Sequence, residues 1–157
     1  PILHRDLKSL NILLDERQIV KLCDFGESRS AGKEARTMTM VGTPMWTAPE
    51  VLLGVPYGLP ADIYSLGIIL VELITRSDPW PAGMWCAQIV AAVVKGERPA
   101  LPSAVSKDVA QLIQRCLYHD PLLRLTAQQV AQRIQDGPSW DFVTFLRARA
   151  ESKALFT

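Results

Sequence analysis

Four polar side chains near the start of the chain have the chemistry needed to transfer a negatively charged group. Asp6 supplies a carboxylate that can accept a proton, and Lys8 supplies a cation that can offset developing negative charge. Asn11 and Asp24 supply hard oxygen ligands, which suit Mg²⁺ better than a soft metal. Phosphoryl transfer needs this combination, because its catalysis depends on neutralising charge and holding two oxygens in line. The residue types are therefore compatible with phosphoryl transfer that uses Mg²⁺, and the pattern in which they occur must decide for or against it.

Each of these side chains, taken singly, also has a plain structural explanation. Asp6 could cap a turn, Lys8 could be a solvated surface lysine, and Asn11 could satisfy a loop. Their motif context favours catalysis: H-R-D-L-x-x-x-N spans 4–11, D-F-G follows an apolar run at 24–26, and A-P-E stands at 48–50. The three motifs in this order make chance coincidence a poor explanation.

These motifs resemble the C-terminal lobe of a eukaryotic protein kinase, over essentially the whole chain. The runs V-G-T-P-M-W-T-A-P-E at 41–50 and K-G-E-R-P at 95–99 are similar to the tyrosine-kinase-like group of serine/threonine kinases. The resemblance implies a serine/threonine kinase that uses ATP and Mg²⁺ and phosphorylates Ser or Thr hydroxyls of a protein substrate.

The resemblance also implies roles for individual residues. Asp6 and Lys8 occupy the catalytic positions, and Asn11 and Asp24 the metal-binding positions. The implied ATP-binding residues are Lys8, Asn11, Leu13, Cys23 and Asp24, with Leu13 under the adenine ring. Strand alternation predicts that Cys23 faces the nucleotide pocket, although a buried inert thiol is an equally good interpretation.

The segment between the D-F-G and A-P-E motifs resembles an activation segment. Arg5, which precedes Asp6, pairs in related kinases with a phosphorylated loop, because a phosphate adds nearly two negative charges. We expect Thr39 to be the best-placed acceptor and Thr37 the second. Thr43 is expected to contact the catalytic Asp6 and Lys8 directly.

Further residues have structural counterparts in the family. His4 is expected to pack against Phe25, and Asp62 to hold the backbone amides of the catalytic loop. Glu50 and Arg124 are expected to form a buried ion pair. Two local expectations accompany these: Gly26 allows a sharp turn after Asp24, and Trp46 helps to form the substrate groove.

The elements that must position these residues divide the chain into a strand-and-loop part and a helical part. Short apolar runs at 12–14 and 19–23 predict two strands joined by a polar turn, and 26–45 read as a long functional loop. Helices are predicted at 60–75 and 83–94, from the caps Ser106 and Thr126, and at 140–154. The predicted fold is mainly α: a helical C-terminal kinase lobe with a short β-hairpin at the catalytic cleft and without the N-terminal lobe.

The predicted domain organisation is one kinase-lobe part over 1–157. It comprises the catalytic loop and metal-binding motif at 1–26, the activation segment at 27–50 and the helical subdomain at 51–157.

Composition narrows the class of protein. The 157 residues are 48% hydrophobic and carry a net charge of +1, with no basic stripe, so we expect no nucleic-acid partner. The three cysteines are far apart, which favours a reducing compartment, and we predict a cytoplasmic protein. No apolar run is long enough to span a bilayer, so no membrane segment is expected.

Three functions stay open at this level. The first is an active serine/threonine kinase. The second is a pseudokinase or truncated lobe that acts as an interaction scaffold, and the third is a tyrosine kinase, which Lys8 and the Gly42-Thr43 step disfavour. No glycine-rich loop or V-A-I-K strand occurs within these residues, so we expect a partner in the missing N-terminal lobe of a longer parent and an inactive fragment.

Overall fold

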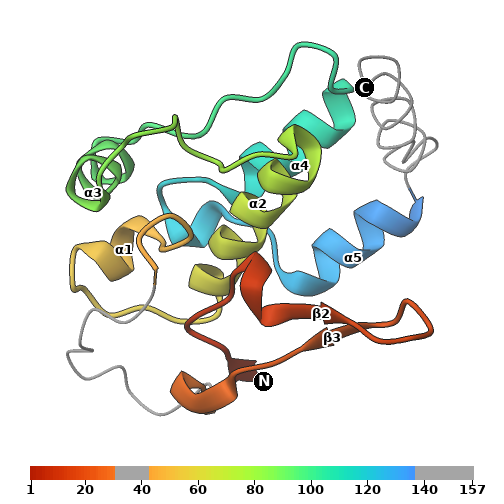
Figure 1. The fold of residues 1–157 in the computed structure, drawn as a ribbon. Coiled ribbons are helices and arrows are strands. Elements are labelled where there is room, and N and C mark those ends of the chain that lie inside the picture. The colour runs from red at the N-terminus through yellow and green to blue at the C-terminus, as the bar shows by residue number, and fades with distance from the viewer. Residues whose placement is uncertain (31–42, 137–157) are drawn as a thin grey trace.

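A computed structural model describes residues 1–30 and 43–136 of the chain. Helices dominate the described residues, and the strands form two small antiparallel sheets (Figure 1). The helices are α1 (Pro49–Leu52), α2 (Pro60–Thr75), α3 (Cys86–Val94), α4 (Lys107–Cys116) and α5 (Ala127–Asp136), with short 3₁₀ turns at Ser9–Asn11, Phe25–Glu27 and Pro121–Leu123. The strands are β1 (Ile2–Leu3), β2 (Ile12–Leu14), β3 (Val20–Leu22) and β4 (Arg29–Ser30). The mainly helical fold class predicted from the sequence is confirmed.

The β2–β3 hairpin places the two predicted metal ligands at the same end of one element. Its register pairs Ile12 with Leu22, so the residues that flank the pair, Asn11 and Cys23, meet where the strands begin and end. At the far end, the Asp15 carboxylate accepts hydrogen bonds from two backbone amides and closes the turn. The second strand is shorter than predicted, at Val20–Leu22.

Helix α2 is the centre of the core, as its nearly continuous apolar sequence predicts. Tyr64, Ile68 and Val71 are fully buried, and α2 packs along α4 in the middle of the molecule (Figure 1). Gly67 permits this close approach: a Cβ there would stand 2.9 Å from the Cβ of Cys116. The predicted bounds of α2 agree with the structure.

The other helices match their predicted caps, with one exception. Ser106 accepts a hydrogen bond from the Val109 amide at the start of α4, and Thr126 accepts one from the Gln129 amide at the start of α5. Helix α3 begins at Cys86 rather than at Gly83, because Gly83 has a φ of +85° and cannot continue a right-handed helix. The predicted helix at 140–154 lies outside the described residues.

The β2–β3 hairpin and its neighbours carry many exposed apolar side chains. These side chains are large, are 48% to 72% exposed, lie on both sides of the strands, and are together called the hairpin apolar face: Leu10, Leu13, Leu14, Ile19, Val20, Leu22 and Phe25. Within residues 1–30 and 43–136, no helix has the length and apolarity that crossing a membrane would require.

Candidate active site

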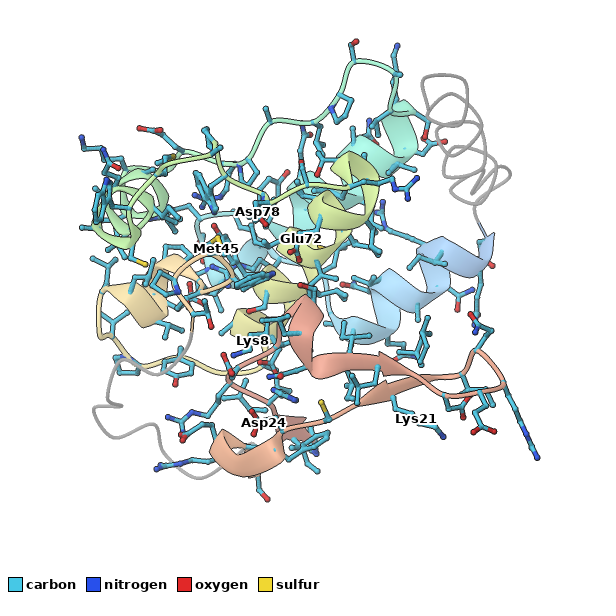
Figure 2. The ribbon with its side chains drawn as sticks, in the orientation of Figure 1. Lys8, Lys21, Asp24, Met45, Glu72 and Asp78 are labelled. Atoms are coloured by element: carbon cyan, nitrogen blue, oxygen red, sulfur yellow. The ribbon has the colours of Figure 1, made fainter. Side chains whose placement is uncertain are left out.

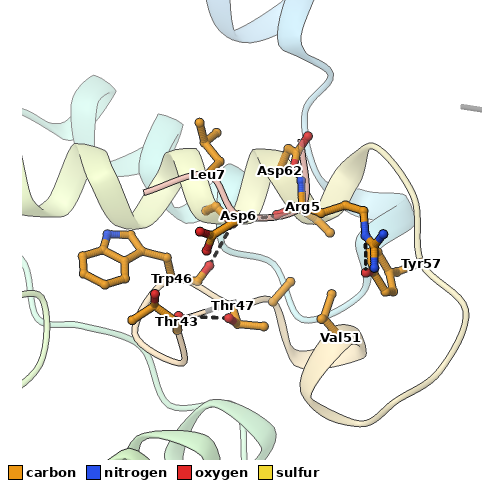
Figure 3. A pocket seen from close by; sticks show the side chains of 12 residues that line it. Arg5, Asp6, Leu7, Thr43, Trp46, Thr47, Val51, Tyr57 and Asp62 are labelled. Atoms are coloured by element: carbon orange, nitrogen blue, oxygen red, sulfur yellow. Dashed lines mark hydrogen bonds between the residues drawn. The ribbon is translucent and has the colours of Figure 1, made fainter. Parts of the chain in front are cut away.

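The catalytic loop is held in an uncommon backbone conformation by one acid on α2. Arg5 has a φ of +76°, a region that non-glycine residues rarely occupy. The Asp62 carboxylate accepts hydrogen bonds from the backbone amides of His4 (2.6 Å) and Arg5 (3.0 Å). Burial raises the pKa of Asp62, while these two amides act in the opposite direction by stabilising the ionised form. Asp62 thus lies where the sequence analysis expected it, at the base of the loop (Figure 3).

Asp6, Lys8 and Asn11 form one connected group above that base. The Lys8 Nζ lies 2.6 Å from the Asp6 Oδ2, and the Asn11 Nδ2 donates to the Asp6 backbone carbonyl at 2.8 Å. Lys8 also donates to the Thr43 hydroxyl at 3.3 Å, which joins this group to the segment after the long loop. The arrangement places a carboxylate, a cation and a hydroxyl side by side, which suits proton acceptance beside a transferred anion.

Asn11 and Asp24 approach each other through the hairpin backbone. The amide of Cys23 donates to the Asn11 carbonyl at 3.0 Å, so Asp24 follows directly after a residue bonded to Asn11. The Asn11 Nδ2 is directed to Asp6, which leaves its Oδ1 as the oxygen available to a cation. The described residues contain no cluster of three or more His, Cys, Asp or Glu side chains suited to a metal. Two protein oxygens nevertheless fit Mg²⁺, which usually completes its shell with phosphate and water.

The sharp turn after the second strand is located at a different residue from the one expected. Asp24 itself has a φ of +61°, whereas Gly26 has no left-handed φ. An aspartate tolerates this region better than most residues, so glycine is not required for the turn. The expectation that Gly26 provides the turn is therefore wrong.

His4 connects the catalytic loop to the D-F-G motif. Its ring lies 4.8 Å from the Phe25 ring, and its Nε2 is 3.0 Å from the Cys23 carbonyl. The Cys23 thiol is half-buried and lies 3.5 Å from the Asn11 carbonyl. Leu13 belongs to the hairpin apolar face, where its side chain is 52% exposed.

Glu50 and Arg124 form a buried ion pair. Two guanidinium nitrogens of Arg124 each lie 2.6 Å from a Glu50 carboxylate oxygen. The remaining donors of Arg124 reach the backbone carbonyls of Pro60, Tyr118 and His119. This pair ties α1 to the segment between α4 and α5, and both side chains are almost inaccessible to solvent.

The Arg5 guanidinium already has partners in this structure. Its Nε donates to the Tyr57 hydroxyl at 3.0 Å (Figure 3), and its Nη1 donates to the Glu27 carbonyl at 3.1 Å. The expected acceptors of phosphate, Thr37 and Thr39, lie outside the described residues. Tyr57 carried no sequence motif, so its contact with Arg5 could not be anticipated.

Trp46 lines a small pocket together with Asp6 and Thr43 (Figure 3), and its part in a substrate groove stays a prediction. Its side chain is 6% exposed, and its indole Nε1 donates to the Glu72 carboxylate at 2.7 Å. Glu72 was missed by motif analysis. The only available signal was its place on an apolar helix, where Asp62, Ser65 and Glu72 recur close to one face.

Comparisons with known proteins agree with this geometry. A family model described as protein kinase domain matches residues 1–134. The probable serine/threonine-protein kinase drkA of Dictyostelium discoideum is 45% identical over 93% of this chain and 23% of its own length. The serine/threonine-protein kinase CTR1 of Arabidopsis thaliana is 44% identical over 79% of this chain and 15% of its own length. The chain thus spans less than a quarter of the length of these relatives.

Proposed function

Because this chain belongs to the protein kinase family, we propose that it forms the catalytic-loop and helical part of a serine/threonine protein kinase. The proposed reaction transfers the γ-phosphoryl group of ATP to Ser or Thr hydroxyls of proteins. The observation that carries this proposal is the contact of Lys8 with both the Asp6 carboxylate and the Thr43 hydroxyl.

In the proposed mechanism, Asp6 orients the substrate hydroxyl and accepts its proton as the phosphoryl group is transferred. Asn11 and Lys8 fix the direction of the Asp6 carboxylate through hydrogen bonds of 3.3 Å and 2.6 Å. Lys8 also brings positive charge to the side of the site where the transferred group gains negative charge. Positioning and charge neutralisation of this kind supply most of the rate in phosphoryl transfer.

Asn11 Oδ1 and the Asp24 carboxylate are the proposed Mg²⁺ ligands. When bound, Mg²⁺ neutralises the phosphate oxygens of ATP. The left-handed backbone at Asp24 supports this assignment, because it turns the chain away from β3 and leaves the Asp24 side chain exposed. We assign the adenine-side contacts to Leu13 and Cys23.

Two features favour serine/threonine over tyrosine specificity. Lys8 stands two residues after Asp6, where tyrosine kinases usually carry Ala or Arg in this loop, and Thr43 is placed to contact that lysine. The named relatives are described as serine/threonine kinases.

The hairpin apolar face is evidence that a second lobe forms the other wall of the ATP cleft. Large exposed apolar patches usually mark a surface that is covered in the working assembly. We propose that an N-terminal kinase lobe of the natural protein covers this face and supplies the glycine-rich loop and lysine.

Regulation by phosphorylation of Thr39, with Thr37 as the second acceptor, remains part of the proposal. The Arg5 guanidinium is the cation that we expect to bind the phosphate. Its present partners are the neutral Tyr57 hydroxyl and Glu27 carbonyl, which a phosphate could replace with a charge-assisted contact. If Thr37→Ala and Thr39→Ala together leave activity unchanged, this part of the proposal fails.

The test of the proposed function is an Asp6→Asn variant of the natural full-length protein. Asparagine keeps the shape of the side chain but cannot accept the proton. Transfer from labelled ATP to a Ser/Thr peptide library should fall to background. Asp15→Asn, the same change in the hairpin turn, is the control and should retain wild-type transfer. A wild-type protein that binds ATP but transfers nothing would favour the scaffold function.

A further inference from the structure

Glu72 joins two parts of the proposed site that are distant in sequence. Its Oε1 accepts a hydrogen bond from the Ser9 hydroxyl at 3.1 Å, and its Oε2 accepts one from the Trp46 indole at 2.7 Å. Ser9 belongs to the catalytic loop, directly after Lys8, and Trp46 belongs to the segment that follows the activation loop. One carboxylate on a core helix therefore fixes both segments. Figure 2 labels Glu72 together with Lys8 and Met45, the chain neighbours of Ser9 and Trp46.

The Trp46 segment has additional anchors, all of which come from α2 or from the residues shortly after it. The Ser65 hydroxyl donates to the Trp46 carbonyl at 2.8 Å, and the Trp80 indole donates to the Met45 carbonyl at 3.3 Å. These contacts hold the backbone of the segment. The Glu72 contact links the Trp46 side chain to Ser9 of the catalytic loop, beside the direct Lys8–Thr43 hydrogen bond.

Both oxygens of Glu72 are engaged by neutral donors, and Glu72 makes no hydrogen bond to Asp6 or Lys8 in the described structure. Glu72 is therefore placed to set the distance between the catalytic loop and the Trp46 segment rather than to take part in the chemistry. This distance matters because the Lys8 Nζ and the Thr43 Oγ1, which lie on the two sides of the bridge, are only 3.3 Å apart. Small shifts of such groups cost large factors in rate.

We infer that Glu72 is a positioning residue, which sets the register between the catalytic loop and the substrate-side segment 43–47 through Ser9 and Trp46. This inference rests on the proposed kinase function. Its effect should appear in peptide turnover and peptide KM together, whereas the KM for ATP should change less, because Glu72 makes no hydrogen bond to the adenine-side residues Leu13 and Cys23.

The kinetic test compares Glu72→Ala, Glu72→Gln and Trp46→Phe in the natural full-length protein. Glu72→Ala should lower kcat/KM for a Ser/Thr peptide by about 10- to 100-fold, with kcat reduced and peptide KM raised. Glu72→Gln should lose less, because its amide oxygen can still accept one of the two hydrogen bonds. Glu97→Ala, at an exposed acid in the α3–α4 connection, is the control and should leave all constants unchanged.

A double-variant measurement isolates the bridge from general destabilisation. Trp46→Phe should lower activity in the wild-type background but add no further loss in the Glu72→Ala background, since its partner is already gone. Losses that multiply would overturn the inference, as would a fall in kcat alone with an unchanged peptide KM. A loss confined to peptides with basic residues would also overturn it, because Glu72 would then be a substrate contact.

A structural readout separates this inference from the proposed function. In full-length protein labelled with ¹⁵N at tryptophan, the Trp46 indole N–H resonance, assigned through Trp46→Phe, should shift in both Glu72 variants. Absence of phosphoryl transfer by the wild type would refute the kinase function while this shift still reported the bridge. An unchanged Trp46 resonance in Glu72→Ala would refute the bridge even in an active kinase.

Discussion

The side chains that hold the candidate site in place are mostly acids whose surroundings disfavour their charge. Burial raises the pKa of Glu72, the hydrogen bonds from Trp46 and Ser9 lower it, and the nearby Asp78 carboxylate raises it further. Such a carboxyl keeps its proton to a higher pH in the folded chain than in the unfolded chain. Its ionisation is therefore coupled to folding.

This coupling predicts how stability changes with pH. As the pH rises from the ordinary glutamate pKa through the raised pKa of Glu72, the unfolded chain loses this proton first, so the contribution of Glu72 to folding stability decreases. Glu72→Gln removes that dependence. Urea unfolding of both proteins from pH 4 to 7 should show the wild type losing stability relative to Glu72→Gln in this window, with a constant difference above it. A difference that grows in favour of the wild type as pH rises would contradict the prediction. Asp78→Asn should narrow the window.

At the residue scale, arrangements that depend on local spacing could be predicted and those that depend on tertiary neighbours could not. The positions of Asp6, Lys8 and Asn11 follow from one motif, because a single loop holds all three. Glu72 has no such motif, since its two partners lie 63 and 26 residues away. The left-handed backbone at Asp24 could not be predicted either, because glycine adopts this conformation most easily and Gly26 lies only two residues away.

At the scale of the elements, the Glu50–Arg124 pair connects the start of α1 to the segment between α4 and α5. We expect Arg124→Ala to destabilise the chain by about 3–5 kcal/mol, because it leaves the buried Glu50 carboxylate without a partner. Chemical unfolding of the variant measures this loss. The double variant Glu50→Gln with Arg124→Met should recover part of it by removing both charges, and a single-variant loss below 1 kcal/mol would contradict the prediction.

The contact between α2 and α4 gives a second prediction at this scale. Gly67→Ala places a methyl group 2.8 Å from the Leu117 side chain and 2.9 Å from the Cys116 Cβ. Because the Cys116 Cβ moves only with its helix, the two helices must separate, and we expect a loss of about 1–3 kcal/mol. Gly58→Ala is the matched control: its Cβ would meet only Pro60, at an ordinary 3.9 Å, so thermal unfolding should show little change or a slight gain. Equal melting temperatures for Gly67→Ala and the wild type would refute the packing argument.

Elements with strong local signals were the most predictable. The bounds of α2 follow from Pro60 at its start and from a nearly continuous apolar run, and the starts of α4 and α5 follow from their cap residues. The start of α3 does not follow from the sequence, because residues 81–85 include apolar side chains that extend the apolar pattern although the helix begins only at Cys86.

At the scale of the whole molecule, the hairpin apolar face is the feature that most affects behaviour in solution. We predict that residues 1–157, produced alone, self-associate through this face and transfer no phosphate. Replacing the cross-strand pair Leu14 and Val20 by Lys and Glu should reduce association in sedimentation velocity, because the register keeps the opposite charges paired. Leu122→Lys, at an 87% exposed leucine on another surface, should not have this effect. Equal association of both variants would show that the hairpin apolar face is not responsible.

The position of Asp62, Ser65 and Glu72 on one helix has a consequence for how the protein fails under heat. Helix α2, which fills the hydrophobic interior, also holds the catalytic loop by two backbone amides and the Trp46 segment by the carbonyl and indole of Trp46. The loop cannot stay ordered once α2 melts, and α2 melts only when the interior opens. The amide hydrogens of His4 and Arg5 should accordingly exchange with solvent no more slowly than those of α2 itself. When α2 unfolds on heating, the order of the catalytic loop should be lost in the same step.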